Sequence, residues 1–275
     1  MRAVGWLASV ALVTACATAG AVPRPVEIPV RQQPRPIVPP VPTRGSPVHV
    51  MLVGDSLAWE ASGPFANALT KSGDAVVKVM AYGGTDWCTY AADLRSTVAS
   101  FHPDAVALEF SGNNLGPCMA DPDTGRPLSG EALVLKYVRD ATDAIDYLLG
   151  QHVAVYLASI PVARRPHPQD GALGAAIVHL AEDHPGVRYV DAGATVEAHG
   201  TYADYLPCLP NEPCLDVDPT TGLPAARVRA PDGVHFCPDG LPAVNGVTPQ
   251  CDRWSSGASR YGKAIADPII TDFGL

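Results

Sequence analysis

The sequence has few basic residues and lacks the common metal-binding motifs. It has 275 residues, and from Val48 on its 14 basic and 27 acidic residues give a net charge of −13. This charge argues against nucleic acid and anionic lipid as direct partners, since both bind positive surfaces. No Cys-x-x-Cys or His-x-x-x-His pair accompanies the cysteines, so a zinc site is a weak alternative for them. The acidic runs at 121–123 and 216–218 lack the spacing and closing Glu of a calcium loop. We expect no metal and no cofactor.

The chain also lacks an apolar run long enough to cross a bilayer. Residues 4–15 are apolar but too short for a span. They follow Arg2 and precede small residues at 17–19 that fit a signal-peptidase site, so we interpret residues 1–21 as a signal peptide of an exported protein. Residues 13–16 resemble a bacterial lipobox, in which Cys16 would be lipidated and would anchor the protein to the outer face of a membrane. An ordinary cleaved signal with an incidental Cys is the alternative.

Proline dominates the next segment. Nine prolines lie within residues 22–47, a composition that favours an extended polyproline II linker of about 3.1 Å per residue. A disordered tail would have the same composition. We expect one domain, residues 48–275, which acts as a monomer.

Six cysteines remain when Cys16 is set aside, and an even number in an exported chain indicates disulfides. Six cysteines allow 15 pairings. Proximity in the sequence favours two pairs and leaves a third: Cys208–Cys214, Cys237–Cys251 and Cys88–Cys118.

Short apolar runs alternate with stretches of helical periodicity from residue 48 on. The pattern predicts strands at 48–53, 76–81, 105–110, 153–159 and 187–190. It predicts helices at 58–71, 90–101, 131–149, 171–182 and 258–270. Strands separated by helices pair in parallel through right-handed crossovers, which predicts an α/β fold: a three-layer α/β/α sandwich with a five-stranded parallel sheet. Residues 201–257 lack this periodicity, and we expect a long irregular insertion held by disulfides.

Sites in such folds lie at the carboxyl ends of the strands. Ser56 follows the first strand directly, at the start of a helix, where it is either an N-cap or an exposed nucleophile. Asp232 and His235 form an Asp-x-x-His run late in the chain, and such an Asp can orient and stabilise a histidine base. Glycines at 83–84 and asparagines at 113–114 follow the second and third strands and could donate hydrogen bonds to an oxyanion.

These four blocks resemble the SGNH (GDSL-type) hydrolase family, as an exported, actinobacterial-like member. The resemblance covers most of the chain from Val48 and implies a flavodoxin-like sandwich. It implies that Ser56 is the nucleophile, that His235 is the base and that Asp232 orients the base. The N–H groups of Ser56 and Gly84 would form the oxyanion hole.

The resemblance implies that an Asn completes the oxyanion hole. Asn114, rather than Asn113, fits the spacing from Gly112, and Gly83 is the fallback for Gly84. The family's Asp after that Asn is absent, since Leu115 stands there, which puts the local hydrogen bonding in doubt. The Gly-x-Ser-x-Gly elbow of α/β-hydrolases is missing, because Ala58 stands in the last glycine's place. A Cys88–Cys118 bridge would join the loops that carry Gly84 and the Asn.

The resulting hypothesis is an exported serine esterase, located outside the cell or in its envelope. Its substrate would be a small-molecule or glycan ester, such as acetyl or short acyl groups on envelope glycans or acylated sugars. Two alternatives stay open at this point. One is an acyltransferase that passes the acyl group to a sugar or lipid alcohol, and the other is a non-catalytic binding module on the same fold.

Overall fold

Five strands form one parallel sheet in the order β2-β1-β3-β4-β5. The computed structural model describes residues 45–237 and 254–275. The strands are β1 (Val48–Gly54), β2 (Ala75–Ala81), β3 (Ala105–Glu109), β4 (Ala154–Ala158) and β5 (Val187–Val190). The strand order reverses direction at β1, between β2 and β3. Ligands bind at such switch points in open α/β sheets.

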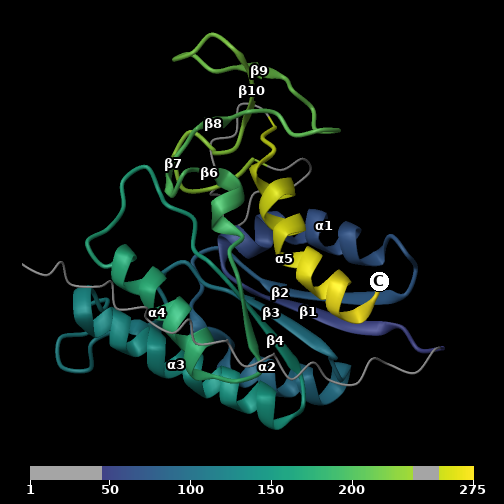
Figure 1. Cartoon of the computed structure of the whole chain (residues 1–275). Coiled ribbons are helices and arrows are strands. Elements are labelled where there is room, and N and C mark those ends of the chain that lie inside the picture. Colours follow the sequence, from purple (N-terminus) through teal and green to yellow (C-terminus); the bar gives the residue numbers. More distant parts are fainter. Residues whose placement is uncertain (1–44, 238–253) are drawn as a thin grey trace, which may run out of the picture. The chain divides into compact units, whose positions relative to one another are not determined.

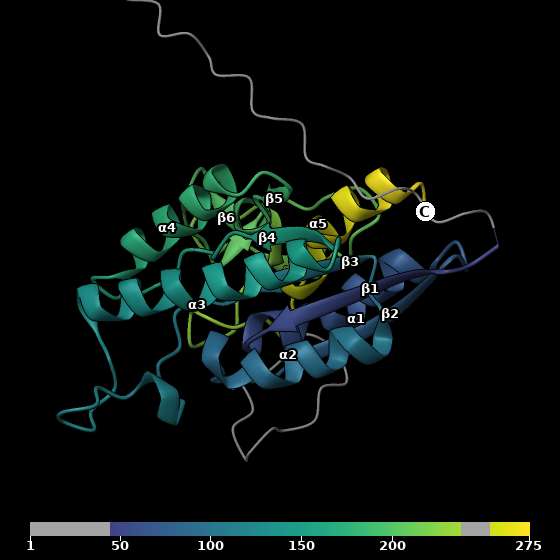
Figure 2. The same cartoon turned by 90° about the horizontal axis from the view of Figure 1, so that it is seen from below.

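Five helices cover the two faces of the sheet (Figures 1 and 2). They are α1 (Ser56–Thr70), α2 (Trp87–Phe101), α3 (Gly130–Gly150), α4 (Asp170–Asp183) and α5 (Gly257–Phe273). The pair α1 and α5 packs on one face, and α2, α3 and α4 pack on the other. The predicted three-layer sandwich is therefore confirmed.

The two apolar layers follow from the alternation of side chains along each strand. In β1, Val50 and Leu52 face the layer of α1 and α5, while Met51 and Val53 face the layer of α2 and α3. All four side chains are buried, because a parallel sheet with helices on both faces has no solvent side. A continuous apolar run in the sequence is the signature of such a strand.

The register brings the ends of three strands to the same level. Gly54, the last residue of β1, pairs with Ala81 of β2 and with Glu109 of β3. The segments that leave these strands therefore start side by side at one edge of the sheet. These are the segments that contain Ser56, the two glycines and the two asparagines.

Short strands follow β5 in the stretch expected to be irregular. They are β6 (Glu197–Ala198), β7 (Thr201–Tyr202), β8 (Tyr205–Leu206), β9 (Asp216–Val217) and β10 (Pro224–Arg227). Strands β8, β10 and β9 form a small antiparallel sheet, and β6 pairs with β7. Two-residue strands show no periodicity in a sequence, which is why the pattern did not predict them. Within the described residues, two 3-10 turns complete the elements, η1 (Pro117–Met119) and η2 (Gly193–Val196).

Some predictions concern segments outside the described residues. The signal peptide, Cys16 and nearly all of the proline-rich linker lie before residue 45, and Cys251 lies between 238 and 253. These predictions stay predictions. Among the residues that the structure describes, none of the helices has the length and apolar character needed to cross a membrane.

Candidate active site

Ser56 is the first residue of α1, directly after β1. The backbones of β1 and β3 approach closely here, since a Cβ atom on Gly54 would lie 2.2 Å from the carbonyl oxygen of Glu109. Asp55 is the N-cap of α1, and its Oδ1 accepts a hydrogen bond of 3.0 Å from the N–H of Leu57. Because Asp55 caps the helix, the Ser56 hydroxyl is not needed for that role.

Ser56, His235 and Asp232 form one hydrogen-bonded chain. The Ser56 Oγ lies 3.0 Å from His235 Nε2, and His235 Nδ1 lies 2.7 Å from Asp232 Oδ2. The other oxygen of Asp232 accepts hydrogen bonds of 2.9 and 3.0 Å from the N–H groups of Val234 and His235. The side chains of His235 and Asp232 are 31% and 39% exposed, so the chain is open to a substrate.

The groups around this hydrogen-bonded chain of side chains favour an ionised Asp232 and a basic His235. Burial alone would raise the pKa of Asp232, but hydrogen bonds from the His235 ring and two backbone N–H groups hold it well below its ordinary value. Burial alone would lower the pKa of His235. The hydrogen bond to Asp232 and the negative charges of Asp232 and Asp55 outweigh burial and raise that pKa, and Glu60 contributes to the rise only when it is ionised. His235 is therefore a stronger base than a free imidazole.

Two arginines hold the loop that contains Asp232 and His235. The buried guanidinium of Arg229 donates to the carbonyl oxygens of Val234, at 3.2 Å, and of Val162, at 3.1 Å. The backbone N–H of Arg164 donates to Gly233 O at 2.9 Å. These contacts come from outside the sheet, so the position of the base depends on polar contacts rather than on the strand register.

Asp55 also gathers the residues that follow β3. Its buried Oδ2 accepts hydrogen bonds from the N–H of Ser111 at 2.7 Å, from the hydroxyl of Ser111 at 2.6 Å and from Asn113 Nδ2 at 2.9 Å. The side chain of Asn114 instead donates to the carbonyl oxygen of Leu128 at 2.7 Å. Asn113 thus contacts the residue next to the nucleophile, whereas the predicted donor Asn114 contacts the segment before α3.

The two glycines after β2 lie close to different residues, Gly83 to Ser56 and Gly84 to Leu115. A Cβ atom on Gly83 would lie 3.9 Å from the Cβ of Ser56. Gly84 has a φ of 75°, a left-handed conformation that favours glycine. A Cβ atom there would lie 3.3 Å from the side chain of Leu115. Both glycines keep the backbone accessible between the loops after β2 and β3.

The structure contains the Cys88–Cys118 disulfide, which joins the start of α2 to η1. The buried side chain of Asp86 supports the same junction: its Oδ1 accepts the N–H of Thr89 at 3.0 Å and its Oδ2 accepts the N–H of Gly116 at 3.2 Å. A covalent bond and a carboxylate therefore connect the loops after β2 and β3. Cys208–Cys214 is also present, in the insertion.

Two buried carboxyl groups near Ser56 were not predicted from the sequence. Glu109 Oε2 accepts the N–H of Ala58 at 3.0 Å, and Glu60 Oε2 accepts the N–H of Phe236 at 2.6 Å. Burial and the negative charge of Asp55 raise the pKa of Glu109 well above its ordinary value. A charged residue at the end of an apolar strand, and another one helical turn after the Ser, were the signals available in the sequence.

A cleft of about 620 Å³ opens beside the triad. Leu57 and Val234, the neighbours of Ser56 and His235, line one part of it, together with residues 111–115 after β3. The far part is lined by residues after β4 and by the starts of α3 and α4, where Arg165 and His167 are exposed. The lining mixes hydroxyl, amide and basic groups with small apolar side chains, as a site for a polar ligand would.

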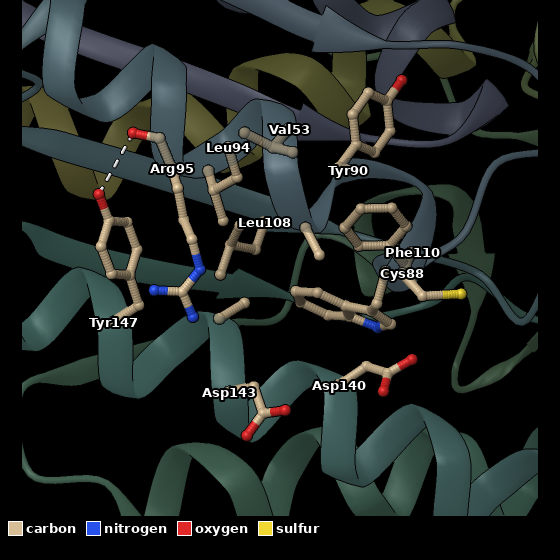
Figure 3. A pocket seen from close by; sticks show the side chains of 13 residues that line it. Val53, Cys88, Tyr90, Leu94, Arg95, Leu108, Phe110, Asp140, Asp143 and Tyr147 are labelled. Atoms are coloured by element: carbon tan, nitrogen blue, oxygen red, sulfur yellow. Dashed lines mark hydrogen bonds between the residues drawn. The ribbon is translucent and has the colours of Figure 1, made fainter. Parts of the chain in front are cut away.

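A second, smaller cavity of about 80 Å³ lies between α2 and α3 (Figure 3). Trp87, Leu94 and Phe110 form its apolar wall. At its edge the Arg95 guanidinium stacks over the Tyr147 ring at 4.3 Å, and the Tyr147 hydroxyl donates to the Arg95 carbonyl oxygen at 3.3 Å. The lining of this cavity contains none of residues 54–58 or 232–236, whereas Leu57 and Val234 line the larger cleft.

Comparisons with known proteins agree with this architecture. No protein-family model matches the sequence, and no curated protein matches it either. A GDSL-like lipase from Bacteroides thetaiotaomicron is similar in structure with a TM-score of 0.51 and 12% identity, over 82% of this chain and 89% of that chain. A lipase/acylhydrolase from Enterococcus faecalis has a TM-score of 0.51 and 16% identity, over 81% of this chain and 95% of that chain. The chain therefore has the fold of GDSL-like lipases and acylhydrolases.

Proposed function

We propose that the protein is an exported serine esterase that cleaves an ester through an acyl-enzyme. The observation that carries this proposal is the hydrogen-bonded chain of Ser56, His235 and Asp232 at the open end of the sheet. A nucleophile with an adjacent base, and a base oriented by a carboxylate, is the arrangement that acyl transfer needs. The likeness of the fold to lipases and acylhydrolases supports the same reaction class.

The reaction proceeds in two halves. His235 Nε2 takes the proton of the Ser56 hydroxyl while Ser56 Oγ attacks the ester carbonyl carbon and forms a tetrahedral oxyanion. Asp232 stabilises the imidazolium, and His235 then gives the proton to the leaving alcohol as the ester C–O bond breaks. In the second half, water gives a proton to His235 and attacks the carbonyl carbon of the acyl-enzyme. The bond to Ser56 Oγ then breaks, His235 returns the proton to Ser56 and the acid leaves.

The oxyanion requires hydrogen-bond donors at its own position. We assign the N–H groups of Ser56 and Gly84 to this role, with Gly83 as the neighbouring alternative. For the third donor the geometry favours Asn113 over Asn114. One N–H of the Asn113 amide is bound to Asp55, which fixes the group beside Ser56 and leaves the second N–H for the substrate.

The cleft supports a polar alcohol part of the substrate. Its lining includes the hydroxyl and amide groups of Ser111, Asn113 and Ser129, and its volume of about 620 Å³ is large compared with an acetyl group. Short acyl or acetyl esters of a glycan or an acylated sugar fit this chemistry. The two disulfides indicate an oxidising environment, and we propose that residues 1–21 direct export and that Cys16 carries a lipid anchor.

Labelling with a fluorophosphonate probe tests the nucleophile. We expect the protein to be labelled once, and Ser56→Ala and His235→Ala to abolish labelling. Ser96→Ala, on the surface of α2, serves as the matched control and should label normally. A protein that neither labels nor cleaves any ester would be a non-catalytic module on this fold.

A series of acyl esters of increasing chain length then measures the substrate class. We expect kcat/KM to be highest for acetyl and short acyl groups on a sugar. The same assay with an added sugar acceptor compares hydrolysis with acyl transfer. Faster transfer than hydrolysis would assign the protein to acyltransferases and overturn the hydrolase proposal.

A further inference from the structure

Glu60 is a buried carboxyl group behind the triad that the proposed reaction does not use. It follows Ser56 by four residues in α1, so both side chains project from the same side of the helix. Glu60 is only 2% exposed. Its Oε2 accepts a hydrogen bond of 2.6 Å from the N–H of Phe236, the residue after the base. A buried carboxyl group destabilises a fold unless it is paired, so its position calls for an explanation.

The charged and titratable groups that face Glu60 belong to the site itself. They are His235, Asp232, Asp55 and the guanidinium of Arg229. Burial raises the pKa of Glu60 to about 8, even though the charge of a protonated His235 and the hydrogen bond from Phe236 both lower it. Because His235 and Glu60 affect each other, their protonation is coupled.

We propose that Glu60 is a positioning residue for His235, which fixes the backbone of the base through Phe236 and, when ionised, stabilises the imidazolium. This inference rests on the proposed esterase function. Glu60 and Asp232 occupy different positions. Asp232 binds the His235 ring at the exposed side of the loop. Glu60 acts from the buried side, where the low dielectric strengthens the attraction between its charge and the imidazolium.

The ionisation of Glu60 gives the proposal a distinct pH signature. Glu60 is mainly neutral at pH 7, since its pKa is about 8, and it gains its negative charge above that pH. The imidazolium forms in the transition state and is then stabilised more strongly. We therefore expect kcat to rise in two steps, first as His235 loses its proton and again above about pH 8 as Glu60 ionises, because the loss of the imidazolium charge removes one cause that lowers the pKa of Glu60.

The test compares the wild-type protein with Glu60→Gln, which keeps the size and the acceptor for Phe236 but not the charge. For an acetyl ester, with buffer hydrolysis subtracted, the second rise in the wild-type kcat is expected to be about tenfold. Glu60→Gln should lack that rise and keep KM within about twofold. Glu60→Asp retains a charge and should restore part of it. Glu182→Gln, an exposed position on α4, is the matched control and should keep the wild-type profile.

An NMR titration of the His235 ring separates this inference from the esterase proposal, because it needs no turnover. The His235 signal is assigned by its loss in His235→Gln. We expect the wild-type signal to shift in two steps, the second above about pH 8 as Glu60 ionises, and the signal of Glu60→Gln to lack the second step. A ring titration and pH profile unchanged in Glu60→Gln would overturn the inference even in an active esterase. Loss of the second step in Glu60→Gln, in a protein that cleaves no ester, would support the coupling and overturn the esterase proposal.

Discussion

The two halves of the triad are built in different ways. The nucleophile half, residues 54–56 with Ser111 and Asn113, is held by the sheet and by a buried carboxylate. The base half, residues 229–236, follows the last short strand of the insertion and contains a half-exposed Asp and His. It is positioned by hydrogen bonds that Arg164 and Arg229 donate to its carbonyl oxygens and by one that Glu60 accepts from the N–H of Phe236.

Because of this difference, substitutions in the two halves should affect stability and activity differently. Changes in the nucleophile half disturb buried hydrogen bonds between β1 and the loop after β3, so they should lower both stability and activity. Changes in the exposed part of the base half should lower activity and leave the free energy of unfolding nearly unchanged, because the side chains there keep much of their hydration. Four predictions test this comparison.

Replacing Asp55 should have the largest combined effect. Asp55→Ala removes the cap of α1 and leaves the Ser111 hydroxyl and N–H and the Asn113 amide without their common acceptor. We expect a loss of about 2–4 kcal/mol in the free energy of unfolding and more than about 10³-fold in kcat/KM. Urea unfolding and an ester assay measure both. Asp93→Ala, an exposed position on α2, is the control, and a stable but inactive Asp55→Ala would contradict the comparison.

Asp232→Asn should lower activity far more than stability. It removes the charge that orients His235, and we expect kcat to fall by about two to four orders of magnitude. Asp232 also raises the pKa of His235, so in the wild type kcat/KM should fall as the pH drops through a value above about 6.5. In Asp232→Asn this acid limb should move to lower pH. Asp218→Asn alters a comparable exposed turn, in which Asp218 Oδ1 accepts the N–H of Thr220 at 2.8 Å, and should keep both kcat and the limb.

The two asparagines offer a sharper test within the nucleophile half. If Asn113 donates to the oxyanion, Asn113→Ala should lower kcat by about 10²- to 10³-fold with little change in KM. Asn114→Ala should have a smaller effect on kcat, through its hydrogen bond to Leu128. The reverse order of the two variants would restore the assignment of Asn114 that the sequence spacing predicted.

Removing a disulfide should have the smallest effect on activity. Cys88→Ser/Cys118→Ser opens a loop with a sequence separation of 30, and the chain-entropy model gives a loss of about 3–4 kcal/mol. We expect kcat to stay within about threefold, because Asp86 still binds Thr89 and Gly116. Cys208→Ser/Cys214→Ser, with a separation of 6, should lose only about 2 kcal/mol. A large loss of kcat in the first double variant would show that Asp86 alone cannot hold the loops.

Much of the fold could be predicted because its signals are local. The buried strands are continuous apolar runs, and residues such as Phe65 and Leu69 mark the helix stripe that packs on them. The segments at the strand ends could be predicted as well, since a parallel sheet brings all its carboxyl ends to one edge. The Cys88–Cys118 pairing could be predicted for the same reason. Cys88 follows β2 and Cys118 follows β3, and these two strands flank β1 in the sheet.

The support behind the triad could not be predicted, since it depends on contacts between distant segments. Glu60 and Phe236 are 176 positions apart, and Arg229 reaches Val162 across 67 positions. The choice between Asn113 and Asn114 likewise depends on which side chain Asp55 binds, which the spacing from Gly112 does not determine. The short strands of the insertion lack any periodic signal.

Asp86 has a consequence for how the protein matures. Its carboxylate holds the start of α2 and the N–H of Gly116 through hydrogen bonds that require no oxidant. The two sulfur atoms of Cys88 and Cys118 lie 3.1 and 3.5 Å from the same Asp86 oxygen. A newly made chain can therefore assemble both loops while its thiols are still reduced. Oxidation would then act on neighbours that are already in place, and the correct pair would form without a search among the other cysteines.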